Sequence, residues 1–161
     1  MDAVGIIGTG VMGLTAGRKF IESGRRVIAF DTAPGAQERA RQAEFEVTAG
    51  PTEVARLCPI ILMFLPGPAQ IIECVAGPAG LLLAAAAGTV IVDLSTGDPA
   101  TTLRMAALAR DRGVGYLDAP VLGRPASVGR WALPVGGRAE DIECCRSVLA
   151  TVAANIIHVG E

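Results

Sequence analysis

Residues 4–13 read Val-Gly-Ile-Ile-Gly-Thr-Gly-Val-Met-Gly, and no other segment of the chain says as much about its fold. The apolar run Val4–Ile7 predicts a buried strand that enters the pattern G-x-G-x-x-G, and a helix is predicted to follow. In such a unit Gly8 permits a tight turn, Gly10 lets a pyrophosphate approach the backbone, and Gly13 lets the helix pack close to the strand. The free N–H groups at the start of the helix favour phosphate at this point.

A second apolar run, Val27–Phe30, ends at Asp31 and completes a strand–turn–helix–strand–acid pattern. Asp31 can accept hydrogen bonds from both hydroxyls of an adenosine ribose and would repel a 2′-phosphate, so the pattern predicts NAD and makes NADP the less favoured cofactor. Thr32 brings no cation, although Arg25 and Arg26 are near in sequence. Proteins that bind FAD or S-adenosylmethionine also use glycine turns, so the pattern alone leaves the class of ligand open.

The composition supports an α/β fold. With 161 residues, 51% of them apolar, the chain is long enough for one domain with a substantial core. Continuously apolar strands are typical of a parallel sheet that helices cover on both faces. We therefore predict a doubly wound Rossmann fold with a mostly parallel sheet of seven or eight strands. The net charge of −2 and the lack of a basic run give no indication of a nucleic-acid partner.

One uncharged stretch, Cys74–Val92, is long enough to cross a bilayer. Gly77, Pro78 and Gly88 interrupt it, so a helix end, a short helix and a buried strand are expected there, and no membrane partner. No basic segment precedes the first apolar run, so a signal peptide is not expected.

The four cysteines have no metal-ligand spacing, and no metal site is expected. We predict that all are reduced, packed thiols of a cytoplasmic protein: Cys58, Cys74, Cys144 and Cys145.

Further apolar runs predict four more strands, and the carboxyl ends of parallel strands form the edge of the sheet at which doubly wound folds bind their ligands. Pro134 argues that the last of these strands lies at an edge of the sheet. The predicted strands are Ile60–Leu65, Thr89–Asp93, Val114–Ala119 and Trp131–Val135.

Together these motifs resemble the N-terminal domain of the β-hydroxyacid dehydrogenases, which include 3-hydroxyisobutyrate dehydrogenase, tartronate semialdehyde reductase and 6-phosphogluconate dehydrogenase. The resemblance follows the whole chain in order. It rests on Gly8–Gly13 (GxGxMG), Met63–Pro66 (MxLP), Asp93–Thr96 (DxST), Asp118–Val121 (DAPV) and the pair Gly136-Gly137.

The resemblance implies a set of cofactor-binding residues. Leu65 and Pro66 would contact the adenosine half, Thr96 would lie near the nicotinamide ribose, and Met12 would line the cofactor site. The full set is Gly8, Thr9, Gly10, Val11, Met12, Gly13, Asp31, Thr32, Leu65, Pro66 and Thr96.

The implied substrate segment departs from the family. Where the family has Ser-Gly-Gly, this chain has Leu122-Gly123-Arg124. Arg124 could restore anion binding through a two-pronged contact with a carboxylate. The alternative is that Arg124 is a solvated loop residue.

The family's general acid/base lysine lies on a helix after the Rossmann domain. The only lysine of this chain, Lys19, falls on the first helix at a position that does not match. We therefore expect no catalytic residue within residues 1–161 and no turnover by this chain alone. The all-helical domain that completes the site and supports a homo-oligomer is expected outside this chain.

The resemblance implies hydride transfer, with NAD(P), at a CH–OH group of a small 3-hydroxy acid or its semialdehyde. The substrate would be a small carboxylate. One alternative is a stand-alone NAD(H)-binding module without catalysis. Another is an imine-reductase-like reductase, which the altered segment Leu122–Arg124 would fit.

Several other chemistry-bearing residues are predicted to be structural. His158 has no nucleophile at a recognisable spacing, and Trp131 is expected to pack beside the substrate loop. Asp93 and Asp118 are expected to cap the turns that follow their strands rather than to act as an acid–base pair.

Overall fold

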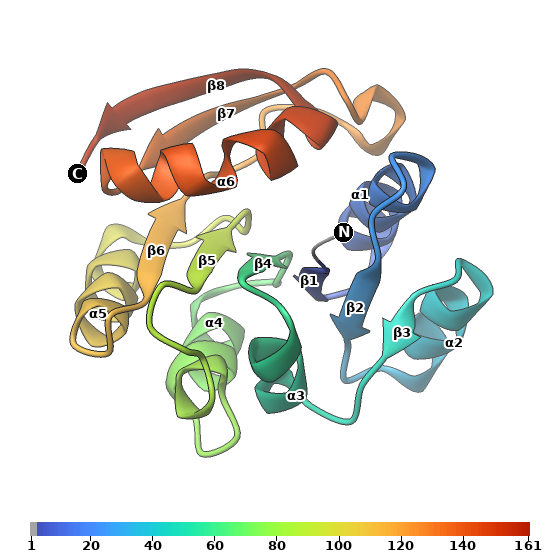
Figure 1. Ribbon diagram of the computed structural model, residues 1–161, viewed down its shortest axis with the longest axis horizontal. Coiled ribbons are helices and arrows are strands. Elements are labelled where there is room, and N and C mark those ends of the chain that lie inside the picture. The colour runs from blue at the N-terminus through green and yellow to red at the C-terminus, as the bar shows by residue number, and fades with distance from the viewer. Residues whose placement is uncertain (1–2) are drawn as a thin grey trace.

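The computed structural model describes residues 3–161, in which eight strands form one sheet in the order β3-β2-β1-β4-β5-β6-β7-β8 (Figure 1). All neighbouring strands are parallel except β6 and β7. The predicted mostly parallel, doubly wound fold is confirmed. The strands are β1 (Val4–Ile7), β2 (Val27–Phe30), β3 (Glu46–Val47), β4 (Ile60–Met63), β5 (Val90–Asp93), β6 (Gly115–Asp118), β7 (Trp131–Gly136) and β8 (Ala153–Gly160).

Helices cover both faces of the sheet (Figure 1). Residues of α1, α2 and α6 belong to one apolar core, and residues of α3, α4 and α5 belong to the other. The helices are α1 (Val11–Glu22), α2 (Pro34–Gln42), α3 (Pro51–Leu57), α4 (Pro68–Ala76), α5 (Pro99–Arg110) and α6 (Ala139–Val152), with short 3₁₀ turns η1 (Leu81–Leu83) and η2 (Pro125–Ser127).

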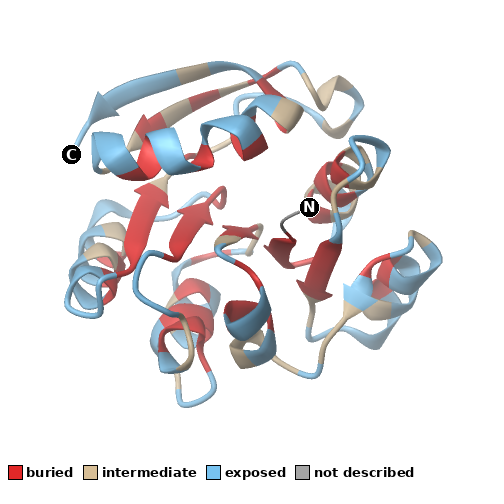
Figure 2. Ribbon diagram, in the orientation of Figure 1, coloured by how far each residue is buried: buried red, intermediate tan, exposed pale blue. Residues whose placement is uncertain are grey.

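The central strands are buried on both sides, as Figure 2 shows. Side chains alternate along a strand, so Ile6 joins the core under α1 and α6, whereas Ile7 joins the core under α3 and α4. This arrangement explains why the strands are continuously apolar rather than alternating.

The order of the strands fixes where a ligand can bind. From β1 the chain first adds β2 and β3 on one side and then returns to add β4, β5 and β6 on the other. The connections from β1 and from β4 therefore leave the sheet in opposite directions. This reversal opens a crevice at the carboxyl ends of the two strands, the usual ligand site of doubly wound sheets.

The prediction that Pro134 marks an edge strand is wrong, because β7 lies between β6 and β8. The antiparallel contact of β7 with β6 is limited to the pair Asp118 and Gly136, and Ala132 instead pairs with Leu122. Residues two apart direct their backbone nitrogens to the same side. The nitrogen of Pro134 therefore falls between these two contacts, where no ladder hydrogen bond is required.

The prediction that all four cysteines are packed is also wrong, because Cys144 is exposed on α6. Cys58, Cys74 and Cys145 are buried, and burial raises the pKa of each thiol to about 12. These three thiols are therefore protonated at neutral pH. None of the helices within residues 3–161 combines the length and the apolar character that a membrane span needs.

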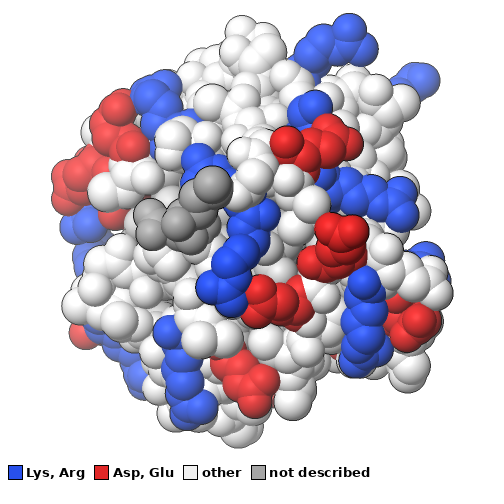
Figure 3. Space-filling model, turned by 45° about the vertical axis from the view of Figure 1, so that its right-hand side comes forward, with Lys and Arg blue, Asp and Glu red and all other residues white. Residues whose placement is uncertain are grey.

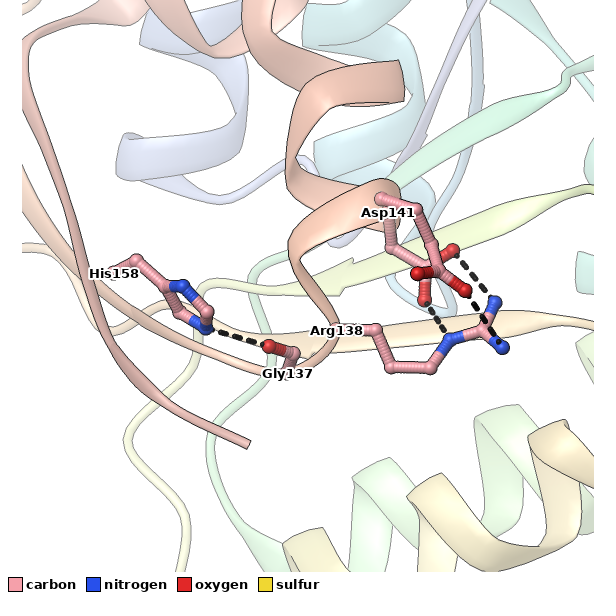
Figure 4. Close-up of polar contacts among 5 residues, drawn as sticks. Gly137, Arg138, Asp141 and His158 are labelled. Carbon is pink, nitrogen blue, oxygen red and sulfur yellow. Dashed lines mark hydrogen bonds and ion pairs between the residues drawn. The ribbon is translucent and has the colours of Figure 1, made fainter.

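A polar cluster holds the turn between β7 and α6 (Figure 4). The Arg138 guanidinium donates from Nε to Oδ2 of Asp141 at 3.0 Å and from Nη2 to Oδ1 at 3.2 Å. The Asp141 side chain is buried against β6, where a Cβ at Gly115 would lie 2.6 Å from its carboxyl carbon. His158 of β8 lies with Nε2 2.8 Å from the carbonyl oxygen of Gly137. The contact between His158 and Gly137 connects β8 to this turn, which is a structural role for the histidine.

Candidate dinucleotide site

Of the three glycines in the turn after β1, only Gly10 has space for a Cβ atom, whereas Gly8 and Gly13 have none. Gly8 has a positive φ of 87°, and a Cβ there would collide with the carbonyl oxygen of Phe64. A Cβ at Gly13 would collide with the carbonyl oxygen of Gly8. At Gly10, in contrast, a Cβ would meet nothing within 4 Å. Gly8 and Gly13 are therefore required by the fold, whereas the space at Gly10 is available to a ligand.

Gly10 is also the N-cap of α1, and no side chain caps this helix end. The first turn of α1 carries no acidic residue. Its backbone N–H groups and the positive end of the helix dipole therefore face the open space at Gly10. This combination fits the pyrophosphate of a dinucleotide.

Asp31 is held next to this turn by the backbone. Its Oδ2 accepts a hydrogen bond from the Thr9 N–H at 2.7 Å, and its Oδ1 accepts one from the Ala33 N–H at 2.9 Å. The carboxylate is only partly buried and lines a cavity. Oδ2 also accepts a long hydrogen bond from the Thr9 hydroxyl at 3.3 Å, whereas Oδ1 keeps one acceptor site free. Asp31 is therefore oriented to receive one ribose hydroxyl at Oδ1, and a second at Oδ2 in place of the Thr9 hydroxyl.

Two cavities meet along the carboxyl edge of the sheet. The first, of about 560 Å³, extends from Asp31 and Thr32 to the side chains of α4. The second, of about 460 Å³, extends from the start of α1 to Thr96 and Gly123. The two cavities share wall residues and form one groove across the switch in strand order: Gly10, Phe64, Leu65 and Pro66.

Most of the residues predicted from the sequence line this groove: Gly8, Gly10, Val11, Met12, Gly13, Asp31, Thr32, Leu65, Pro66, Thr96 and Gly123. Thr9 does not, because it is buried and bonded to Asp31. Leu122 is 63% exposed, and Arg124 is exposed beside it. The predicted substrate segment thus contributes Gly123 to the wall and its other two residues to the rim.

Trp131 fixes this rim. The indole Nε1 donates to the carbonyl oxygen of Arg124 at 2.8 Å, and a Cβ at Gly123 would collide with the indole ring. The fully buried ring also makes an edge-on contact with Phe64, with ring centroids 6.5 Å apart. Trp131 therefore packs beside the loop, as the sequence predicts.

A buried hydrogen-bond network joins the ends of β4 and β5 to Tyr116 within β6. Asp93 is 3% exposed, and its Oδ1 accepts from the Ser95 N–H at 3.0 Å while its Oδ2 accepts from the Tyr116 hydroxyl at 2.7 Å. The Ser95 hydroxyl in turn accepts from the Leu65 N–H at 2.9 Å. The capping role predicted for Asp93 is confirmed. The network also positions Leu65 and Ser95, which both line the groove.

Asp118 behaves differently from Asp93. No hydrogen bond to its side chain is found within residues 3–161, and the predicted capping role is not observed. Partial burial, and after it the negative charge of Asp93, raise the pKa of the Asp118 carboxyl. Its charged form is therefore disfavoured in the folded protein.

We expect Asp118→Asn to increase stability at pH 7 by about 0.5 kcal/mol, a figure reduced for solvent screening. An acid whose pKa is raised on folding contributes stability below its unfolded pKa and loses it as the pH rises through the folded pKa. The gain should therefore vanish near pH 3, where both states are protonated. Urea unfolding at the two pH values measures this, and an equal gain at both would contradict the assignment.

Several wall residues were not among the predicted binding residues, for example Phe64, Gln70 and Glu73. Phe64 lies within the motif Met63–Pro66, so its position directly after β4 carried a signal. Val121, which lines the second cavity, belongs to the motif Asp118–Val121. Gln70 and Glu73 lie within α4, and only the direction in which this helix leaves β4 brings them to the cavity.

Arg25 and Arg26 do not lie near Asp31. They precede β2, whereas Asp31 follows it, so the two sites are at opposite ends of the strand. Arg26 is also paired with Glu46, from Nε to Oε1 and from Nη2 to Oε2, both at 2.9 Å. These arginines are not placed to bind a 2′-phosphate.

The single lysine is likewise outside the groove. Lys19 lies on α1 with its Nζ 3.1 Å from Oε2 of Glu22. On the face of the molecule shown in Figure 3, basic and acidic side chains are interspersed. Among residues 3–161, no group of three or more His, Cys, Asp or Glu side chains is arranged to hold a metal ion.

A doubly wound sheet, an uncapped helix at an open glycine and a carboxylate after β2 define a dinucleotide-binding domain. The family of the NAD-binding domain of 6-phosphogluconate dehydrogenase matches residues 3–160, and the chain belongs to this family.

Similar proteins support this assignment. The chain is 36% identical to 2-(hydroxymethyl)glutarate dehydrogenase of Eubacterium barkeri, over 98% of the chain and 53% of that protein. It is 30% identical to human mitochondrial 3-hydroxyisobutyrate dehydrogenase, over 98% of the chain and 47% of that protein. The structure of Mycobacterium tuberculosis 3-hydroxyisobutyrate dehydrogenase with L-serine superposes with a TM-score of 0.93 at 29% identity, covering 99% of this chain and 55% of that one. The chain thus spans about half the length of the curated relatives that it matches.

Proposed function

We propose that this chain is the NAD-binding half of an oxidoreductase that transfers hydride at the CH–OH group of a small 3-hydroxy acid or its semialdehyde. The names of the relatives support this reaction class. The observation that carries the cofactor assignment is Asp31, whose carboxylate is fixed by two backbone N–H groups at the wall of the groove. A carboxylate at this place accepts ribose hydroxyls and disfavours a 2′-phosphate.

The rest of the groove fits an extended dinucleotide. The open backbone at Gly10 receives the pyrophosphate, and the first cavity receives the adenosine beside Asp31. The second cavity receives the nicotinamide end, with Thr96 on one side and Gly123 on the other. When bound there, NAD supplies the hydride acceptor, and the substrate lies against the 121–124 segment.

We assign the proton transfer to a group outside residues 3–161, because Lys19 is paired with Glu22 and lies away from the groove. The helical domain and the homo-oligomer predicted from the resemblance belong to the same proposal. So does a cytoplasmic location, although the names of several relatives include "mitochondrial".

We expect Asp31→Ala to weaken NADH binding about tenfold and NADPH binding much less, because only NADH gains both ribose contacts. Isothermal titration calorimetry measures both constants. Glu46→Ala is the matched control, since it removes a carboxylate at the other end of the β2–β3 pair. If Asp31→Ala left the ratio of the two constants unchanged, the ribose assignment would be wrong.

We also expect the 161-residue chain to bind NADH without oxidising it in the presence of small semialdehydes. The absorbance of NADH at 340 nm follows this directly. Steady turnover by the chain alone would overturn the assignment of the proton donor to another segment. A longer parent protein that binds NADH but turns over no substrate would favour the non-catalytic binding module.

A second candidate is an imine-reductase-like activity. The observation in its favour is Leu122, an apolar and 63% exposed side chain at the rim where the family has a hydroxyl. In the longer parent protein, reduction of cyclic imines but not of semialdehydes would favour this candidate.

A further inference from the structure

Hydrogen-bond donors of the protein already occupy most of the Asp31 carboxylate. Its Oδ1 accepts one hydrogen bond, from the Ala33 N–H at 2.9 Å. Its Oδ2 accepts two, from the Thr9 N–H at 2.7 Å and from the Thr9 hydroxyl at 3.3 Å. Three of the roughly four acceptor sites of a carboxylate are therefore taken. An adenosine ribose brings two hydroxyl groups, so it meets one open site and one occupied site.

The backbone on both sides of this carboxylate is also fixed. The side-chain amide of Gln37 on α2 donates from Nε2 to the Asp31 carbonyl oxygen at 2.7 Å. The carbonyl oxygen of Phe30, one residue earlier, accepts from the Gly8 N–H at 2.9 Å. These contacts hold Asp31 beside the glycine turn, so a ligand meets the carboxylate with its protein donors in place. To receive both ribose hydroxyls, Asp31 has to release one of these donors.

The Thr9 hydroxyl is the donor that can be released. Its hydrogen bond is the longest of the three, and the other two come from backbone N–H groups that the fold holds in place. Thr9 is only 1% exposed, so water cannot take over as the partner of its hydroxyl. Within residues 3–161, this hydroxyl forms no other hydrogen bond. Its release therefore leaves a buried hydroxyl without an acceptor, which opposes binding of the ligand.

We propose that the Thr9 hydroxyl limits the affinity for NADH, because it occupies the acceptor site on Oδ2 that the second ribose hydroxyl needs. Thr9 does not line the groove and acts through Asp31, as a positioning residue. NADPH has only one free hydroxyl on this ribose, and the open site on Oδ1 can accept it. The effect therefore falls on NADH and narrows its advantage over NADPH. This inference rests on the proposed function, because it requires the adenosine ribose to lie at Asp31.

We expect Thr9→Val to bind NADH about fivefold more tightly than the wild-type chain does, with the affinity for NADPH unchanged. Valine has nearly the shape of threonine, and the backbone N–H of residue 9 still donates to Oδ2. Isothermal titration calorimetry of the full chain measures both constants. Thr9→Ala also lacks the hydroxyl and should show the same gain, whereas Thr9→Ser keeps the hydroxyl and should retain the wild-type constants. A role of Thr9 in packing alone would not change the ratio of the two constants.

Thr101→Val is the matched control. Thr101 likewise contacts a single aspartate through two donors, from its N–H to Oδ1 of Asp98 at 3.0 Å and from its hydroxyl to Oδ2 at 2.7 Å. It lies on α5 and does not line the groove. We expect this variant to bind both dinucleotides as the wild-type chain does, and a gain for NADH here would contradict the role assigned to Thr9.

The outcomes separate the inference from the proposed function. Unchanged or weaker binding of NADH by Thr9→Val and Thr9→Ala would overturn the inference and leave the proposed function standing. An equal gain for NADH and NADPH would also overturn it, because the second ribose hydroxyl would then not be involved. Binding of neither dinucleotide by the wild-type chain would overturn the proposed function and the inference together.

Discussion

We expect Gly10→Ala to fold like the wild-type chain and to bind NADH about 30-fold more weakly. The backbone at Gly10 has a φ of −63°, which alanine adopts readily, and the new methyl group meets no protein atom within 4 Å. The protein itself therefore tolerates the change. The methyl group fills the space through which a pyrophosphate approaches the N-terminus of α1, so the cost falls on the ligand.

The control for this experiment is Gly50→Ala. Gly50 is also the N-cap of a helix, α3, and a Cβ there likewise meets nothing within 4 Å, but it does not line the groove. We expect NADH affinity to be unchanged in this variant. Thermal unfolding of both variants checks the fold, and calorimetry measures the affinity. Wild-type affinity in Gly10→Ala would show that the pyrophosphate lies elsewhere.

The second large effect is on stability. We expect Asp93→Ala to lower the free energy of unfolding by about 3 kcal/mol, because it leaves the buried Tyr116 hydroxyl and the Ser95 N–H without an acceptor. For a chain of this length, this loss corresponds to a fall of about 8 °C in Tm. Urea unfolding and calorimetry measure the two quantities.

Asp98→Ala is the matched comparison for Asp93→Ala. Asp98 also accepts one backbone N–H and one hydroxyl hydrogen bond, both from Thr101, but it lies exposed at the start of α5. Water can replace its hydrogen bonds, so the loss of stability should be clearly smaller. Equal losses in the two variants would mean that burial of the Asp93 network contributes nothing.

The elements around the ligand edge could be predicted because local chemistry defines them. Pro51 and Pro99 mark the first turns of α3 and α5, where their missing N–H groups carry no cost. Gly24, with a φ of 83°, follows the end of α1, where left-handed backbone is common. The glycine turn and Asp31 could be placed because their function requires a fixed order along the chain.

The remaining features depend on how distant segments pack. A proline such as Pro134 normally indicates an edge strand. Here β7 is paired two residues before Pro134, by Ala132 with Leu122, and two residues after it, by Gly136 with Asp118, so Pro134 itself needs no partner. Tyr116 acquires its role only because β5 and β6 are neighbours in the sheet.

A calorimetric titration of the 161-residue chain with NADH and, separately, with NADPH tests directly whether the groove binds a dinucleotide. The geometry at Gly10 and Asp31 predicts one site per chain and tighter binding of NADH. Tighter binding of NADPH would contradict the role of Asp31 and would direct attention to Arg39, whose guanidinium lies near Gly35 at the start of α2. Binding of neither nucleotide would contradict the claim that this groove is a dinucleotide site.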